Sequence, residues 1–136
     1  MSRIFIFTCL FFSFFACNTE EIDTEETPIG SSKSGVVATT SDYELMGSFT
    51  LSSIENTNNL LLTLNENYVA STELPGLYVY LTNDANSVTN ALSLGPVEVF
   101  SGAHNYIIEN VNLTDYTYLL YWCEPFSVKV GGGDIE

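Results

Sequence analysis

The sequence predicts an all-β domain, an antiparallel β-sandwich or small barrel of about seven or eight strands, that follows a disordered N-terminal tether. Three observations lead to this prediction. No window of a dozen residues in 42–136 repeats its apolar residues with the 3.6-residue period of a helix. Short runs rich in Val, Ile, Leu, Tyr and Thr are instead bounded by Asn, Gly, Pro and Asp. The preceding 41 residues have the composition of a targeting signal and a linker.

The expected strands follow one another with turn residues between them. In the first strand, Leu45 and Phe49 lie on the same side of an alternating pattern and are expected to face the core. In the last strand, the same pattern places Phe126, Val128 and Val130 inward. The expected strands are Glu44–Ile54, Leu60–Leu64, Leu77–Thr82, Val97–Ser101, Asn105–Glu109, Tyr116–Cys123 and Phe126–Val130.

The segment Tyr116–Cys123 (YTYLLYWC) gives the strongest strand signal, because aromatic residues are enriched in strands. Successive side chains point to opposite faces of a strand. Trp122 is therefore expected on one face, and Tyr121 and Cys123 on the other. Pro125 is expected to end this strand or to force a bulge, because proline cannot donate a hydrogen bond to the sheet.

Residues 1–16 have the layout of a secretory signal peptide, with Arg3 at the positive end and an apolar core at Ile4–Phe15. This core is shorter than the roughly 20 residues of a membrane-spanning helix. The Ser13–Cys17 end resembles the lipobox of bacterial lipoproteins, with Phe at the position where Leu is usual. The resemblance predicts that acyl chains such as palmitate on Cys17 anchor the protein in a membrane. The alternative is a plain signal peptide that is cleaved before this cysteine.

Residues 17–41 are polar, acidic and poor in aromatic residues, so they are expected to form a disordered tether before a folded domain at 42–136. The acidic cluster at Glu20–Glu26 resembles a run that marks some Gram-negative lipoproteins for the outer face of the outer membrane. A solvated linker explains the same composition. The expected location is therefore the outer membrane, at its periplasmic face or at the cell surface.

The charge balance excludes some partners. The chain has 17 acidic residues against 3 Lys and Arg, a net charge of −14. Nucleic-acid recognition requires a basic face, so no nucleic-acid partner is expected. Binding to anionic lipids by charge alone is excluded for the same reason.

Cys123 is the one cysteine expected in the folded domain, since Cys9 leaves with the signal peptide and Cys17 carries the lipid. Cys123 is a candidate redox thiol or metal ligand, and His104, the single histidine, is a candidate second ligand. A thiolate and an imidazole are compatible with haem iron or copper. The alternatives are a buried cysteine that serves only as a small apolar residue and a loop histidine bonded to backbone or water.

No motif of a common enzyme class is present: the sequence has no G-x-S-x-G, H-E-x-x-H, P-loop or G-x-G-x-x-G. The tyrosines of the expected strands are explained by packing in the core or at its rim. A redox accessory or a binding domain is therefore favoured over a classical enzyme.

Four stretches, in order along the chain, resemble the DM-thirteen domain, which is described as an electron-transfer domain. They are G-S-F-T at Gly47–Thr50, L-Y-V-Y-L at Leu77–Leu81, G-A-H-N-Y-I-I at Gly102–Ile108 and Y-L-L-Y-W-C-E-P-F-S-V at Tyr118–Val128. The last stretch is the most specific. The family has a characteristic Cys after an apolar or aromatic strand and a Phe soon after it, as Cys123 and Phe126 are here.

The resemblance implies an all-β, extracellular or cell-surface domain with redox chemistry at Cys123, and a redox protein as its partner. It leads to the hypothesis of a membrane-anchored lipoprotein that acts in electron transfer. The alternative hypothesis is a non-catalytic surface module that binds protein or glycan, in which Cys123 only packs in the core.

Overall fold

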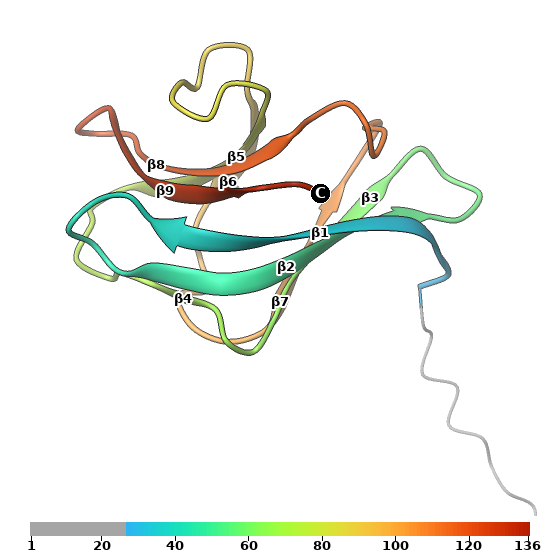
Figure 1. The fold of residues 1–136 in the computed structure, drawn as a ribbon, viewed down its shortest axis with the longest axis horizontal. Coiled ribbons are helices and arrows are strands. Elements are labelled where there is room, and N and C mark those ends of the chain that lie inside the picture. Colours follow the sequence, from blue (N-terminus) through green and yellow to red (C-terminus); the bar gives the residue numbers. More distant parts are fainter. Residues whose placement is uncertain (1–26) are drawn as a thin grey trace, which may run out of the picture.

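The computed structural model describes residues 27–136, which form nine β-strands and no α-helix (Figure 1). This confirms the all-β prediction. Within these residues no helix is long and apolar enough to cross a membrane. The strands are β1 (Ile29–Thr39), β2 (Leu45–Ile54), β3 (Leu60–Leu64), β4 (Val69–Ala70), β5 (Leu77–Thr82), β6 (Leu92–Pro96), β7 (His104–Ile108), β8 (Tyr118–Cys123) and β9 (Val128–Asp134).

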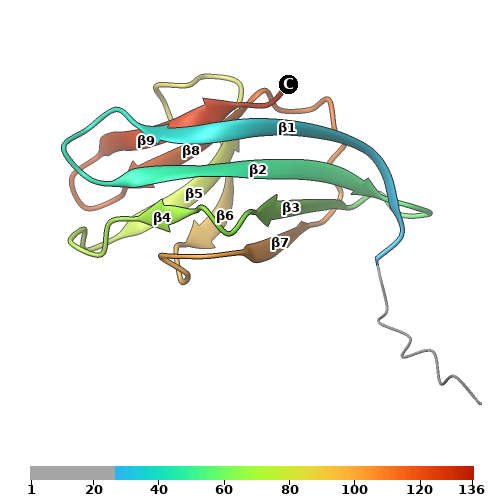
Figure 2. The ribbon, with the colours of Figure 1, turned by 60° about the horizontal axis from the view of Figure 1, so that its bottom comes forward.

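All nine strands belong to one antiparallel sheet that curls around a single main core (Figure 2). The order of the strands is β6-β5-β8-β9-β1-β2-β3-β7, and the short β4 pairs with β2. The sheet forms a nearly closed barrel, in agreement with the predicted small barrel. Strands β6 and β7 are its two edges and are not paired with each other. The barrel therefore has one open seam, between β6 and β7.

Strand β1 corrects the predicted tether. It pairs with β2 along most of its length, from Ile29 opposite Ile54 to Ala38 opposite Met46, and its end also pairs with β9. Val37 points into the core and is 1% exposed. The polar, acidic and aromatic-poor composition indicated disorder, but the backbone pairing on both sides holds this segment in the sheet. The fold thus begins before residue 42, and residues 17–26 of the predicted tether lie outside the described residues.

Two further strand predictions were wrong in detail. Residues 97–101 are not a strand; the strand in this part of the chain is β6, at Leu92–Pro96, which pairs with β5 at the edge of the sheet. Phe126 and Val128 were expected to face inward, but they are 62% and 44% exposed. Residues 124–127 form a turn in which Ser127 has a φ of 51°, and the register of β8 and β9 shifts next to it. This turn reorients the side chains that simple alternation placed in the core.

Strand β9 continues through Gly131–Gly133, beyond the predicted end of the last strand. A side chain at Gly133 would collide with the backbone carbonyl of Val36 in β1, and one at Gly132 would collide with the carbonyl of Leu119 in β8. Glycine is therefore needed here because β9 is packed closely against both neighbouring strands.

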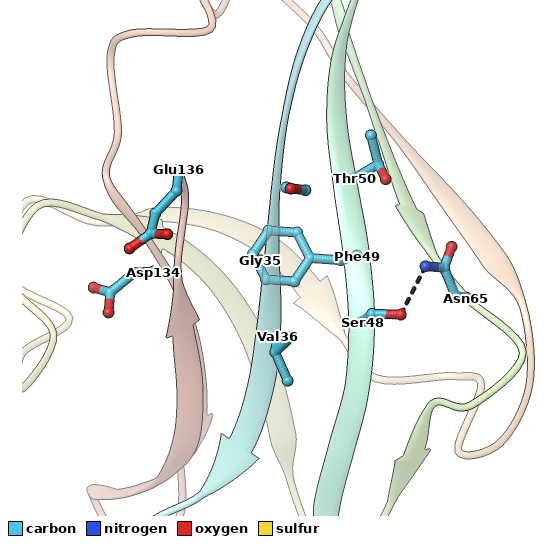
Figure 3. Close-up of a pocket in the computed structure, with 9 residues that line it drawn as sticks. Gly35, Val36, Ser48, Phe49, Thr50, Asn65, Asp134 and Glu136 are labelled. Atoms are coloured by element: carbon cyan, nitrogen blue, oxygen red, sulfur yellow. Dashed lines mark hydrogen bonds between the residues drawn. The ribbon is translucent and has the colours of Figure 1, made fainter.

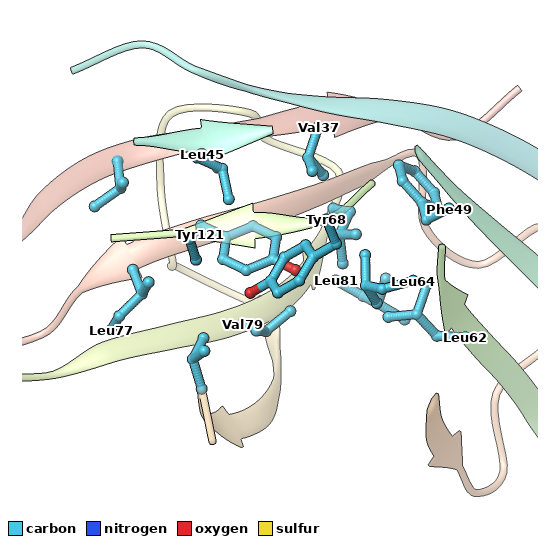
Figure 4. Close-up of a cluster of buried hydrophobic side chains, with 14 of the residues drawn as sticks. Val37, Leu45, Phe49, Leu62, Leu64, Tyr68, Leu77, Val79, Leu81 and Tyr121 are labelled. Carbon is cyan, nitrogen blue, oxygen red and sulfur yellow. The ribbon is translucent and has the colours of Figure 1, made fainter. Parts of the chain in front are cut away.

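The predicted faces of β2 and β8 are confirmed. Leu45 and Phe49 are 2% and 1% exposed and pack in the main core (Figure 4). On β8, Tyr121 and Cys123 belong to this core, while Trp122 packs against a smaller cluster on the other face. Strand β8 therefore has packed side chains on both faces, which accounts for its almost uninterrupted apolar sequence.

Candidate functional site

Cys123 lies at the end of β8, between Leu77 of β5 and Val128 of β9. Its side chain is 0% exposed and forms no disulfide. It packs in the main core with Leu119 and Tyr121, as the alternation of β8 predicts. The thiol is therefore shielded from solvent by packed side chains.

The turn after Cys123 is fixed to the neighbouring strands. The backbone N–H of Glu124 donates to the carbonyl oxygen of Gly76 at 2.9 Å, and the hydroxyl of Tyr80 donates to the Glu124 carboxylate. Lys129 Nζ lies 4.9 Å from the centroid of the Tyr118 ring, on the opposite face of β8 from the thiol. This lysine is therefore not placed to stabilise a thiolate at Cys123.

His104 begins the edge strand β7 and is half-buried. Its Nδ1 lies 2.9 Å from the carbonyl oxygen of Gly102. A carbonyl oxygen only accepts hydrogen bonds, so in the neutral ring Nδ1 carries the proton and Nε2 is the acceptor. Nε2 is buried and has no partner among the described residues, which shows that it is not hydrogen-bonded to the Cys123 thiol.

The ring of His104 belongs to a cluster of buried aromatic residues. Its centroid is 4.7 Å from that of Tyr68, in an edge-to-face contact, and 5.5 Å from that of Tyr106. Tyr68 also lies 6.1 Å from Tyr121. The hydroxyls of Tyr68 and Tyr121 extend into the middle of the core (Figure 4). Neither hydroxyl has a hydrogen-bond partner of good geometry in residues 27–136.

Burial keeps these phenols protonated. Removal from water raises the pKa of Tyr68 to about 12 and raises the pKa of Tyr121 well above its usual value, because an apolar core disfavours a phenolate. The pKa of Tyr106 is raised by burial and by the nearby charge of Glu98. A buried hydroxyl without a partner costs about 1–3 kcal/mol of stability. The cluster therefore places polar groups that lower stability in a core that is otherwise mostly apolar.

Two surface grooves lie away from Cys123. One of about 500 Å³ is bordered by Asp134 and Glu136 on one side of β1 (Figure 3). On its other side, Asn65 Nδ2 donates to Ser48 Oγ at 2.8 Å. The second groove, of about 440 Å³, is lined by residues of β6 and β7 and follows the open seam, where Ile107 is 68% exposed.

No group of three or more His, Cys, Asp and Glu side chains within residues 27–136 is arranged to hold a metal ion. Cys123 and His104 thus do not belong to a metal site of that kind. Cys123 also has no open space for a group as large as haem, because its side chain is enclosed on every side by packed residues. The haem expectation does not fit this core.

A comparison of the sequence with models of known families gave a match. The family model described as electron transfer DM13 matches residues 39–133, which is more than half of the chain. The chain belongs to the electron transfer DM13 family. Comparisons with curated proteins and with solved structures found no match. The resemblance that the sequence motifs indicated is thus confirmed.

The DM13 match begins at Thr39, the last residue of β1, and ends at Gly133 in β9. It includes Cys123, His104 and the buried tyrosines, so all of these residues belong to the DM13 region. Most of β1 precedes the match, yet this strand pairs with both β2 and β9. In this chain the DM13 barrel is therefore completed by residues outside the matched region.

Sequence reasoning missed Tyr68. This residue lies in a turn segment before the two-residue strand β4, where no alternating pattern indicates a buried side chain. Tyr121 was assigned to packing, and only the structure shows that its ring lies 6.1 Å from that of Tyr68 in the core. No local signal in the sequence identifies this pair, because it depends on the closure of the barrel.

Proposed function

We propose that this protein is a lipoprotein anchored in the outer membrane by acyl chains on Cys17, and that its DM13 domain exchanges single electrons with a redox protein through Cys123. The membership of the DM13 family, described as an electron-transfer family, is the observation that carries the proposal. The signal-like residues 1–16 and the cysteine that follows support the anchor.

The burial of Cys123 favours one-electron chemistry over disulfide exchange. Exchange requires a partner sulfur to reach a thiolate, and the side chain of Cys123 is 0% exposed. In the proposed step, the thiol gives one electron to an oxidised haem or copper centre of the partner protein and releases its proton. Burial then keeps the oxidised sulfur away from water and from other thiols until a reductant restores it.

The test is one-electron oxidation of the metal-free, full-length chain, followed by rapid freezing and electron paramagnetic resonance. The proposal predicts a sulfur-centred radical that is absent in Cys123→Ser and in Cys123→Ala. Tyr78→Phe, which changes a tyrosine outside the main core, serves as the control and should keep the signal. A radical found only on tyrosine or tryptophan contradicts a role for the thiol and favours the alternative of a binding module for protein or glycan.

A further inference from the structure

Three polar atoms in the core have no hydrogen-bond partner of good geometry among residues 27–136: Nε2 of His104, and the hydroxyls of Tyr68 and Tyr121, which lie near enough to each other to shift each other's pKa. Their rings form one continuous cluster, with Tyr68 in contact with the other two. Figure 4 shows Tyr68 and Tyr121 extending toward each other inside the barrel. Unpartnered polar atoms are rare in protein cores, and strain, a bound water, a bound ion or a catalytic role accounts for those that occur.

All three atoms are of types that bind metal ions. Phenolate oxygens and imidazole nitrogens are hard and borderline ligands, respectively. His104 also has the arrangement that is usual for a metal ligand. Its Nδ1–H donates to the carbonyl oxygen of Gly102 at 2.9 Å, which fixes the ring and leaves the lone pair of Nε2 free for a metal.

We propose that Tyr68, Tyr121 and His104 together bind one copper(II) ion, at a site distinct from Cys123. As the ion binds, the two phenol O–H bonds break and both protons leave the core, so that two phenolates and a neutral imidazole surround the metal. Two negative charges balance a divalent ion, and a neutral site is the arrangement that a low-dielectric core tolerates best. Among divalent ions, nitrogen and oxygen ligands favour copper.

The open seam gives an ion a route to this site. His104 lies on the edge strand β7 and is only half-buried. Tyr106, whose ring lies 5.5 Å from that of His104, lines the groove of about 440 Å³ between β6 and β7. Strand β7 is bonded on one side only, so it can separate from β6 without breaking a pair of strands.

This copper site goes beyond the proposed function of Cys123 and does not require it. Tyr121 and Cys123 lie two residues apart on the same face of β8. The proposed ligand atom of Tyr121 is its hydroxyl, at the far end of the side chain from the strand. The experiment below can therefore support the copper site without the redox role of Cys123, or the reverse.

The experiment is a titration of the full-length chain in detergent with copper(II) sulfate, after treatment with a chelator. The proposal predicts saturation at one equivalent, with a visible charge-transfer band from phenolate to copper. The band should weaken in Tyr68→Phe and in Tyr121→Phe and be lost in the double variant. His104→Gln removes a ligand and should weaken binding by at least the roughly 10- to 100-fold that the loss of an outer-shell partner costs. Tyr78→Phe and Cys123→Ser should keep the band and the affinity.

Three results would overturn the proposal: copper binding without a charge-transfer band, a band that persists in the double variant, or a band that is lost in Cys123→Ser. The last result would place the copper at the thiol and would support the role of Cys123 instead. If the double variant does not fold, zinc is added to the wild-type chain. Ultraviolet absorption of newly formed phenolate supports the site, and its absence overturns it.

Discussion

At the scale of single residues, the buried hydroxyls of Tyr68 and Tyr121 are the feature that sets this core apart. Each is fully buried, and neither has a hydrogen-bond partner of good geometry within the described residues. Phenylalanine at both positions would fill the core with the same ring and without a buried hydroxyl. The presence of two phenols therefore costs stability in the metal-free protein.

We predict that Tyr121→Phe stabilises the metal-free chain by about 1 kcal/mol, because the change removes an unsatisfied polar group and keeps the ring. Urea unfolding of the wild type and the variant measures the difference. Tyr78→Phe, at a half-buried position, should change the stability by less than about 0.5 kcal/mol. A loss of more than about 1 kcal/mol in Tyr121→Phe would mean that its hydroxyl is satisfied in the metal-free protein.

The raised pKa of Tyr68 predicts a loss of stability at alkaline pH. In the unfolded chain the phenol ionises near pH 10, whereas in the folded protein it keeps its proton until about pH 12. The free energy of unfolding is therefore unaffected by this phenol's ionisation well below pH 10. It falls as the pH rises from 10 toward 12, because only the unfolded chain gains from losing the proton. Between pH 9 and 11.5, the wild type should lose about 2 kcal/mol more than Tyr68→Phe. Equal losses in both proteins would show that Tyr68 ionises normally in the fold.

At this scale the sequence predicted part of the site. Alternation along β8 correctly placed Cys123 and Tyr121 on one buried face, because strand geometry is local. Neither Tyr68 nor the partnerless Nε2 of His104 was predictable, since both depend on contacts between β7, β8 and the segment before β4. The proposed role of Cys123 as a redox thiol remains a prediction.

At the scale of elements, β1 and β9 show why strand patterns alone did not define the domain. Most of the strands that alternate apolar and polar residues were found, whereas β1 is largely exposed and β9 contains three consecutive glycines. Such sequences form strands because their neighbours supply backbone partners on both sides. Which strands lie on either side is known only from the folded sheet, and the residues of β1 or β9 alone do not indicate it.

We predict that a chain that begins at residue 42 does not fold, whereas one that begins at residue 27 does. Removal of β1 leaves one edge of β2 and one edge of β9 unpaired and exposes the core around Val37. Circular dichroism and dispersion of amide signals in nuclear magnetic resonance distinguish the two chains. A cooperative unfolding transition in the shorter chain would restore the boundary that the sequence predicted.

In β9, we predict that Gly133→Ala destabilises the fold by about 1–3 kcal/mol, because the new methyl group collides with the backbone carbonyl of Val36. Gly30→Ala is the matched control. Its methyl group would approach only the hydroxyl of Ser53, a side chain that can move. Thermal unfolding compares the two variants. A similar and small effect of both substitutions would show that β9 and β1 are not closely packed.

For the whole molecule, acidic side chains far outnumber basic ones, since only Lys33 and Lys129 are Lys or Arg in residues 27–136. A surface of this charge gives anionic lipid headgroups little to bind, so the proposed attachment to a membrane does not rest on the barrel. The proposed lipid on Cys17 would supply it.

We predict that Cys17→Ser moves the protein from the membrane fraction to the soluble fraction and abolishes labelling with radioactive palmitate. Two or more acyl chains are needed for stable anchoring, and this cysteine is their proposed point of attachment. Fractionation of bacterial cells that express each protein measures the change. Cys123→Ser should leave the fractionation unaltered. A Cys17→Ser variant that stays labelled and bound to the membrane would contradict the anchor.

Protein-film voltammetry of the metal-free, full-length chain would detect the proposed exchange of electrons through the buried thiol of the DM13 barrel. We expect a reversible one-electron wave in the wild type that disappears in Cys123→Ser and persists in Tyr78→Phe. A wave of unchanged height and potential in Cys123→Ser, or the absence of any wave in the wild type, would contradict it.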